Sequence, residues 1–318
     1  MKYIGSALLL TLLFCAGMGL TRAQRRSAVP RQPIIDMHVH AHTADRFGKA
    51  SLPNPVTGKP SAAVTDDDIL KMTLAEMRRY NITKAVAGSF MESAERWRAA
   101  AADLFIKGAQ IDVGIPMPDI DQLRAEYRAG RLGAIGEVGG QYLGMSPGDP
   151  ALEPYFALAE ELDIPVGVHM GVGPPNATYE CCPKFRMSLG NPLLLEEVLV
   201  RHPKLRLYIM HAGYPFLRET IAVMHLYPQV YADIAVINWV IPREEFHDYL
   251  RGLMRAGMGR RIMFGSDQMI WPEAIGMAVE GTESAPFLTA EQKRDIFYHN
   301  AARFLRLDKT GNVPRAAR

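Results

Sequence analysis

Two histidines near the start of the chain could bind one metal ion together. His38 and His40 stand two positions apart in an apolar run over residues 34–40, which predicts a β-strand. Because side chains alternate across a strand with a period of two, both imidazoles point to the same side. Imidazole nitrogen is a common zinc ligand, so the pair predicts part of a metal site. Taken alone, the same pair could equally be two core histidines with satisfied hydrogen bonds.

Four further side chains that can bind a metal stand at or near the ends of other predicted strands: Glu137, His169, His211 and Asp267. In a barrel of parallel strands, the carboxyl ends of all the strands open at one face, where catalytic residues lie. We therefore expect these four residues to meet the histidine pair. Three of them also have a structural alternative. Glu137 could be a buried structural carboxylate, His211 a hydrogen-bond partner of a ligand, and Asp267 a cap for the following segment.

The elements that would position these residues are short apolar runs that alternate with longer amphipathic segments from residue 33 onward. This alternation predicts βαβ units. Eight strands are predicted, over residues 34–40, 84–88, 111–116, 134–139, 165–169, 205–211, 230–237 and 261–267. Helices are predicted over residues 67–80, 92–105, 123–129, 152–162, 193–201 and 244–258. Asp119 and Asn191 are the expected caps of two of these helices.

Eight such units predict an α/β protein in which residues 33–307 form one metal-dependent (β/α)8 TIM barrel. A doubly wound open sheet is the competing fold. It is disfavoured because no Gly-x-Gly-x-x-Gly motif follows the first strand, although that absence excludes only dinucleotide binders. The loop over residues 43–65 is rich in Pro and Gly, and we expect it to act as an active-site flap.

The first 23 residues predict a cleaved signal peptide. Lys2 precedes an almost unbroken apolar run over residues 7–20, and residues 21–23 form a small-x-small cleavage pattern. The mature protein would then be periplasmic or secreted, with a linker over 24–32, a tail over 308–318 and no stable membrane insertion. An uncleaved membrane anchor is the alternative.

Charge and cysteine content restrict the partners. The chain has 36 basic and 34 acidic residues, and removal of the signal peptide takes away Lys2 and Arg22 but no acid, which leaves 34 of each. This balance argues against a nucleic-acid partner, so we expect a small-molecule substrate and a possible homodimer. Cys181 and Cys182 are adjacent, and we expect two reduced thiols, although an oxidising compartment would allow a disulfide between them.

The motifs at the strand ends resemble those of the amidohydrolase superfamily, in the branch that includes aminocarboxymuconate-semialdehyde decarboxylase. The resemblance spans nearly the whole mature chain. It rests on Ile-Ile-Asp-Met-His-Val-His over 34–40, Gly-Val-His over 167–169, Met-His-Ala-Gly-Tyr-Pro over 210–215, Phe-Gly-Ser-Asp over 264–267 and Asn-Ala-Ala-Arg-Phe-Leu over 300–305. It implies one zinc or similar ion held by His38, His40, His169 and Asp267, with His211 as the catalytic histidine.

Strand four departs from the decarboxylase pattern. Its segment Ala-Ile-Gly-Glu-Val-Gly over 134–139 is more similar to that of TatD-type nucleases and related hydrolases, where a Glu bridges two metals. That similarity implies two ions. One would be held by His38, His40, Glu137 and Asp267, and the other by Glu137, His169 and His211. The sequence leaves the number of ions open between one and two.

Either number of ions suits hydrolysis, because a bound divalent ion makes water acidic enough to supply hydroxide near neutral pH. Asp267 would be the general base, and His211, if not a ligand, would polarise the carbonyl group. The leading prediction is a hydrolase of an ester, lactone or amide in a small cyclic or aromatic substrate. The alternatives are a non-oxidative decarboxylase of an aromatic or unsaturated acid, and a non-catalytic exported metal-binding barrel. Zinc is the first choice, although manganese or iron also suits mixed nitrogen and oxygen ligands.

The loops after the strands supply a largely aromatic lining. Tyr142, Trp239 and Trp271 are predicted to contact a cyclic substrate. Arg186, in the loop after strand five, is predicted to bind a substrate carboxylate, and Arg46 in the first loop is the other candidate. Either arginine could instead be a solvated surface residue. No role is predicted for His42, His202, His225, His247 and His299.

Overall fold

Eight parallel strands form the centre of the computed structural model, which describes residues 31–48 and 52–307. Each strand pairs with its neighbours in chain order. Two backbone hydrogen bonds join the first strand to the segment after the eighth, from Met37 N to Phe264 O and from Asp267 N to His38 O. The predicted (β/α)8 barrel is confirmed. The strands are β1 (Ile34–His40), β2 (Ile82–Ser89), β3 (Phe105–Ile111), β4 (Ala134–Val138), β5 (Val166–His169), β6 (Leu207–Met210), β7 (Tyr231–Asp233) and β8 (Ile262–Met263).

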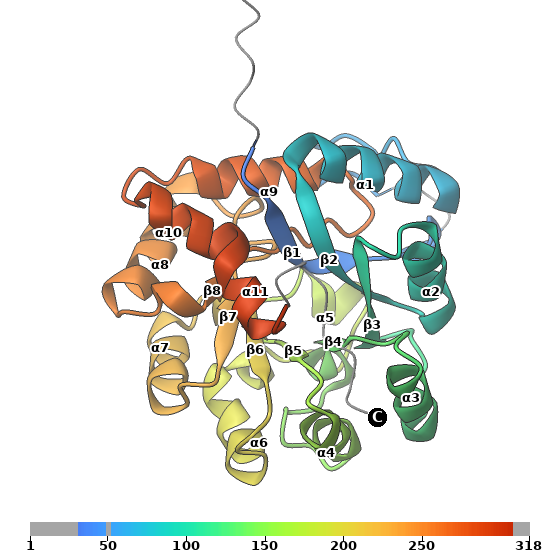
Figure 1. Ribbon diagram of the computed structural model, residues 1–318, viewed down its shortest axis with the longest axis vertical. Helices are drawn as coiled ribbons and strands as arrows, with labels where there is room; N and C mark the ends of the chain where they lie inside the picture. The colour runs from blue at the N-terminus through green and yellow to red at the C-terminus, as the bar shows by residue number, and fades with distance from the viewer. Residues whose placement is uncertain (1–30, 49–51, 308–318) are drawn as a thin grey trace, which may run out of the picture. The chain divides into compact units, whose positions relative to one another are not determined.

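Helices surround the strands on the outside of the barrel (Figure 1). Side-chain caps start several of them: Thr65 accepts a hydrogen bond from the Asp68 backbone, and Asp119 accepts one from Gln122. Asn191 caps the short 3-10 turn before α6, so both expected caps are present. The helices are α1 (Asp66–Tyr80), α2 (Met91–Ala100), α3 (Ile120–Arg128), α4 (Glu153–Leu162), α5 (Ala177–Glu180), α6 (Glu196–Arg201), α7 (Leu217–Leu226), α8 (Arg243–Arg255), α9 (Ala274–Glu283), α10 (Ala290–Arg294) and α11 (Asn300–Phe304).

Apolar side chains from several strand starts form a cluster with the end of α11. Ile35, Tyr208 and Met263 are buried there together with Phe304, whose ring lies 5.5 Å from the ring of Tyr208. Burial of these side chains away from water stabilises the packing of α11 against the strands. The chemically active side chains lie elsewhere, at the opposite ends of the strands.

The third strand lies earlier in the chain than predicted. β3 occupies residues 105–111 rather than 111–116, and α2 ends at Ala100 rather than at residue 105. The prediction failed because Lys107 interrupts the apolar run, which made the segment look unlike a buried strand. In the structure Lys107 is only 4% exposed, and its ammonium binds Glu95 on α2 at 3.2 Å and Glu126 on α3 at 3.1 Å. A buried charge is tolerated here because both neighbouring helices supply a partner.

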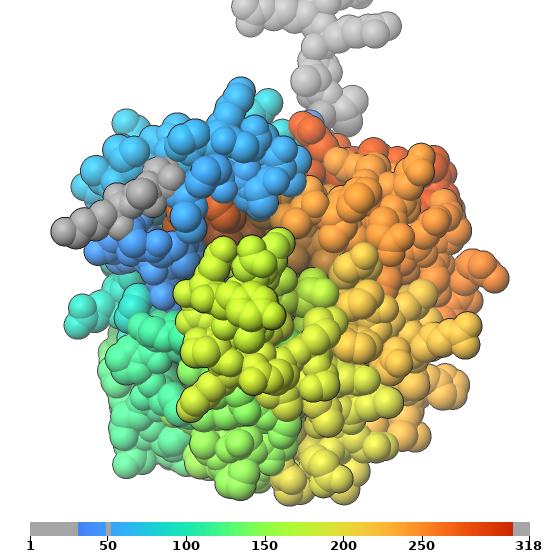
Figure 2. All heavy atoms as spheres, turned by 180° about the vertical axis from the view of Figure 1, so that it is seen from behind, coloured from blue at the N-terminus to red at the C-terminus, as the bar shows by residue number. Residues whose placement is uncertain are grey.

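Two loops reach over the face at which the strands end (Figure 2). The yellow-green segment that contains α5 lies across the middle of this face, and a hollow opens between it, the blue segment after β1 and the orange segment after β8. The described part of the predicted flap packs against the region after β8, since Ser61 donates to Ile270 O and Trp271 donates to Leu52 O. The flap therefore borders the open end of the barrel.

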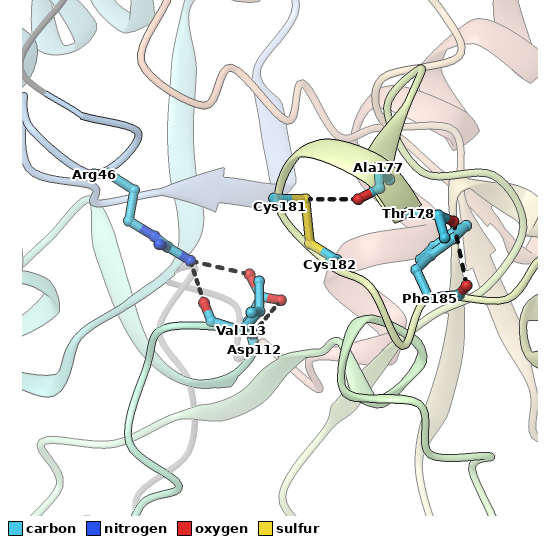
Figure 3. The surroundings of a disulfide bond; sticks show 8 residues. All are labelled: Arg46, Asp112, Val113, Ala177, Thr178, Cys181, Cys182 and Phe185. Carbon is cyan, nitrogen blue, oxygen red and sulfur yellow. Dashed lines mark hydrogen bonds and ion pairs between the residues drawn. A yellow bond between two sulfur atoms is a disulfide. The ribbon is translucent and has the colours of Figure 1, made fainter.

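The two adjacent cysteines form a disulfide, which corrects the prediction of two reduced thiols (Figure 3). In a regular helix or strand, successive side chains point about 100° or 180° apart and could not meet. Cys181 is the first residue after α5, and its φ of −111° differs from the value near −63° of a regular helix, so the pair does not stand within one. The Cys182 side chain is buried beside Phe185, Val113 and Tyr142.

Three sequence predictions concern residues outside the described ranges. They are the signal peptide over 1–23, nearly all of the linker over 24–32 and the tail over 308–318. Within the described ranges, no helix combines the length and the apolar character needed to cross a bilayer.

Candidate active site

The six residues predicted to bind metal meet at the ends of the strands. Each is at most 6% exposed to solvent. β1 carries the histidine pair, β4 carries the glutamate, β5 ends in a histidine, and the other two residues follow β6 and β8. We call this set the ligand cluster: His38, His40, Glu137, His169, His211 and Asp267.

One half of the ligand cluster surrounds the histidine pair on β1. The Nε2 atoms of His38 and His40 lie 3.2 Å apart, and Asp267 Oδ1 lies 3.0 Å from His40 Nε2. Glu137 Oε2 faces both histidines, at 3.7 Å from His38 Nε2 and 3.6 Å from His40 Nε2. Two nitrogens and two carboxylate oxygens thus converge, which suits a zinc-like ion.

The other half uses the second oxygen of the same glutamate. Glu137 Oε1 lies 2.5 Å from His169 Nδ1 and 3.6 Å from His211 Nε2. The two imidazole nitrogens lie 3.0 Å apart. Glu137 therefore stands between the two halves, with one carboxylate oxygen facing each.

The ligand cluster fits divalent metal ions chemically. Two groups in it, His38 with His40 and Asp267, and Glu137 with His169 and His211, have potential ligand atoms within 4.8 Å of one another. Asp267 Oδ1 is buried and, although His40 Nε2 lies 3.0 Å away, it forms no hydrogen bond of good geometry among the described residues. A buried acceptor without such a bond is costly, and a cation held between His38, His40 and Asp267 would satisfy it.

The charges in the ligand cluster keep its carboxylates ionised. Burial alone raises the pKa of Glu137, but the charge of His169 and hydrogen bonds from His169, His211 and His38 hold it well below its usual range. At Asp267 burial is likewise outweighed, first by the charge of His38 and then by the close side-chain contact with His40 and its charge, and the pKa falls to about 2. Both side chains are therefore anionic at neutral pH and able to bind a cation.

Asp233, which the sequence analysis missed, orients two members of the ligand cluster. Its Oδ2 lies 3.2 Å from His38 Nδ1, and its Oδ1 accepts the His211 backbone N–H at 2.8 Å. A carboxylate on Nδ1 fixes the imidazole tautomer and leaves Nε2 as a lone-pair donor toward a metal. Asp233 is the last residue of β7. A carboxylate at the end of a strand was the signal in the sequence that could have identified it.

Two more missed residues hold the backbone of β1. Asp36 Oδ1 accepts N–H groups from His38 at 3.1 Å and from Ser266 at 2.9 Å. Gln268 forms a pair of hydrogen bonds with the backbone of His40, at 3.0 and 2.7 Å. Asp36 stands two positions before His38 in β1, so the alternation of side chains along a strand could have predicted that both lie on the same side. No pattern in the sequence distinguishes Gln268.

Two members of the ligand cluster have a strained backbone. His211 has a φ of 57° and Asp267 a φ of 49°, in the left-handed region that side chains with a Cβ atom disfavour. Such conformations cost about 1–3 kcal/mol each and persist where the surroundings impose them, most often at functional sites. Here the hydrogen bonds from His211 N to Asp233 and from Asp267 N to His38 O impose them.

The predicted substrate-binding residues differ in the side chains and backbone groups that they contact. The Tyr142 ring lies 4.8 Å from the ring of His169. Trp239 and Trp271 lie 6.3 Å apart, and their indole N–H groups bind backbone carbonyls. Arg186 is exposed and donates to the carbonyls of Pro183 and Phe185 in its own loop. The structure therefore does not direct Arg186 toward the ligand cluster.

His42 lies at the ligand cluster, although no role was predicted for it. Its ring stacks on the ring of His40 at 4.4 Å, and its Nδ1 lies 3.0 Å from Ser89 Oγ. His42 follows β1, two positions after His40. We use the name loop rim for the residues on loops above the ligand cluster: His42, Arg46, Asp112, Tyr142, Cys181, Cys182 and Arg186.

Residues 35–307 match the family model described as Amidohydrolase. The chain belongs to the amidohydrolase family. This result confirms the resemblance inferred from the strand-end motifs. Membership supports an enzyme of hydrolase or lyase type and disfavours a non-catalytic barrel.

Solved structures share the fold along most of the chain. An uncharacterized TIM-barrel protein from Bordetella bronchiseptica gives a TM-score of 0.65 at 18% identity, covering 86% of this chain and 98% of that one. A probable 2-pyrone-4,6-dicarboxylic acid hydrolase from Acinetobacter baumannii gives 0.59 at 12% identity, with coverages of 85% and 98%. The 5-carboxyvanillate decarboxylase of Sphingomonas paucimobilis gives 0.56 at 15% identity, with coverages of 88% and 100%. At these identities the likeness shows the fold alone.

A curated protein, protein FluG of Emericella nidulans, is 22% identical over 161 residues. The aligned stretch covers 46% of this chain and 18% of that protein, so the match spans less than a fifth of the relative's length. It therefore supports no statement about the reaction.

Proposed function

We propose that this amidohydrolase-family protein is a hydrolase that uses two divalent metal ions, zinc being the first choice, to cleave an ester, lactone or amide in a small cyclic or aromatic compound. The observation that carries the proposal is the position of Glu137. Its two oxygens face different pairs of histidines, one pair on β1 and the other formed by His169 and His211. A carboxylate in that position can bridge two ions, whereas a single ion would use only one side of it.

The ligands would divide between the two halves of the cluster. His38, His40 and Asp267 would hold one ion, His169 and His211 the other, and Glu137 both. When bound, such ions polarise a carbonyl group and make a water molecule more acidic. Manganese or iron would fit the same mixture of nitrogen and oxygen donors.

Asp267 is the residue best placed to move a proton. Its carboxylate is buried and ionised, and its Oδ1 lies 3.0 Å from His40 Nε2 without forming a hydrogen bond of good geometry among the described residues. It can accept a proton from the attacking water and later deliver it to the oxygen or nitrogen of the leaving group. Asp233 holds His38 in place during this transfer, and the buried position of the cluster excludes bulk water.

Metal content and reaction type test the proposal together. The protein is purified, loaded with zinc and analysed for metal by mass spectrometry, then assayed with esters, lactones, amides and aromatic acids. We expect two ions per chain and cleavage of at least one ester, lactone or amide. Release of carbon dioxide from an aromatic acid, with no cleavage of the other compounds, would establish the decarboxylase alternative and reject hydrolysis.

The Glu137→Gln variant tests the bridge directly. The glutamine side chain has a single, uncharged oxygen in place of the two carboxylate oxygens, so it cannot bridge two ions. Metal content should therefore fall from two ions per chain to one or none. Glu160→Gln is the matched control, because Glu160 also pairs with a histidine, His202 at 3.1 Å, but at a site outside the ligand cluster. Unchanged stoichiometry in Glu137→Gln would place Glu137 outside the metal site.

A further inference from the structure

A largely buried arginine of the loop rim has a hydrogen-bond donor without a partner among the described residues. Arg46 follows β1, and its side chain is 10% exposed. Its Nη2 donates to Val113 O at 2.7 Å and lies 3.4 Å from Asp112 Oδ2 (Figure 3). Its Nε is buried and has no hydrogen-bond partner among the described residues. A buried guanidinium normally has its donors satisfied, so this one calls for a further acceptor.

Ring contacts connect Arg46 to the ligand cluster. Its guanidinium lies 5.2 Å from the centre of the Phe47 ring, which meets the ring of His42 edge to face at 5.5 Å. His42 stacks in turn on His40, a member of the ligand cluster. Arg46 therefore stands two rings away from a candidate metal ligand, at the open end of the barrel.

Asp112 only partly neutralises the charge of Arg46. A charge-assisted N–H to carboxylate bond is about 2.7–2.9 Å long, and the 3.4 Å separation here is well beyond that. Burial, and next the charge of Glu137, raise the pKa of Asp112 to about 7, so a large fraction of this carboxyl is neutral at pH 7. A buried cation with an incomplete counter-charge is unfavourable unless an anion binds to it.

We propose that Arg46 binds a carboxylate of the substrate, and that the substrate is therefore an anionic carbonyl compound whose carboxylate lies away from the bond that is cleaved. The part of this inference that concerns the cleaved bond rests on the proposed hydrolase function. Arg186, the arginine favoured by the sequence, is exposed and already donates to two carbonyls of its own loop. The guanidinium of Arg46 lies two rings away from the ligand cluster and has an unpaired Nε donor among the described residues.

Binding of two small probes tests the proposal without any turnover. Benzoate and nitrobenzene have the same ring and similar size, but only benzoate is charged, and neither contains a bond that the proposed hydrolase would cleave. Their dissociation constants are measured by calorimetry with the metal-free and the zinc-loaded protein. We expect benzoate to bind roughly 10- to 100-fold more tightly than nitrobenzene, the range for a hydrogen-bonded charge pair, in both forms. Arg46→Gln should abolish that preference, and the matched control Arg186→Gln should keep it.

Each result decides the question. A benzoate preference that persists in Arg46→Gln, that disappears equally in Arg186→Gln, or that is missing from the wild type overturns the proposal. If Arg46→Gln does not fold, as judged by circular dichroism, Arg46→Lys takes its place. Lysine keeps the charge but loses the two-pronged donor, so benzoate affinity should fall several-fold, and unchanged affinity counts against the proposal. Because the probes are not cleaved, failure of the hydrolase proposal leaves this test intact.

Discussion

The ligand cluster and the loop rim are held in place in different ways. Members of the ligand cluster stand on strand ends, and buried carboxylate and amide groups bind their backbone or ring nitrogens, as Asp233 does for His38 and His211. The loop rim depends on contacts between loops that are far apart in the sequence, such as Arg46 with Val113. The cluster is thus positioned by the barrel itself, whereas the rim is positioned by a few contacts that can change without loss of the fold.

The largest effect should come from loosening the support of the ligand cluster. Asp233→Asn leaves an acceptor for the His211 N–H but removes the negative charge beside His38 Nδ1. Removal of such a carboxylate behind a metal-binding histidine typically lowers metal affinity about 10- to 100-fold. We expect a loss of that size for zinc, measured by competition with a chelator of known affinity.

A matched substitution in the other region supplies the control. Asp112→Asn changes a buried carboxyl of the loop rim that contacts Arg46 rather than a histidine of the ligand cluster. Zinc affinity should stay within about threefold of the wild type in this variant, since no contact to a metal-binding ring is lost. Equal losses of zinc affinity in Asp233→Asn and Asp112→Asn would show that the loop rim supports the metal site as much as the groups behind the ligand cluster do.

The same distinction explains what could be predicted from the sequence. All six members of the ligand cluster were found because strand periodicity and barrel topology place strand-end residues at one face. The sequence could not decide whether Arg186 or Arg46 binds a substrate carboxylate, because that depends on how each loop folds. The position of β3 was missed for a related reason. The partners of Lys107, Glu95 and Glu126, lie on two helices whose packing no local pattern reveals.

A smaller effect should appear in the pH dependence of stability. Burial outweighs the hydrogen bonds from Ser266 and His38 and raises the pKa of Asp36 to about 7 in the folded protein, above its unfolded value near 4. The folded state therefore favours the protonated acid, so its contribution to stability is fully present below about pH 4 and is lost as the pH rises through 7. Asp36→Asn keeps an acceptor for both N–H groups and removes the titration.

Melting temperatures of the metal-free wild type and Asp36→Asn, measured between pH 5 and pH 8, test this expectation. The wild type should lose stability relative to the variant over this range, by roughly several degrees for a domain of this size. The variant Asp295→Asn, at a half-buried acid outside the ligand cluster, is the control for general effects of removing an acid. A constant difference between wild type and Asp36→Asn across the range would show that Asp36 is already ionised at pH 5.

The smallest effect should follow from opening the disulfide of the loop rim. A disulfide stabilises mainly by closing a loop in the unfolded chain, and the gain grows with the length of that loop. The bond between Cys181 and Cys182 closes only two residues, and Cys182 packs in an apolar cluster with Ala177, Phe185, Val113 and Tyr142, none of which belongs to the ligand cluster. The Cys181→Ser/Cys182→Ser double variant should therefore keep the wild-type zinc content and melt within about 2 °C of the wild type.

Peptide mapping decides whether the bond is present in the wild type before that comparison is made. The peptide that contains residues 181 and 182 should resist alkylation in unfolded, unreduced protein and take up two labels after treatment with a dithiol. Loss of zinc from the double variant would mean that the rim helps to position the metal-binding residues, through the apolar cluster that Cys182 shares with Tyr142 and through the contact of Tyr142 with His169. Unchanged zinc content would instead show that the barrel positions the ligand cluster without help from this loop, because the strand ends and Asp233 supply its support.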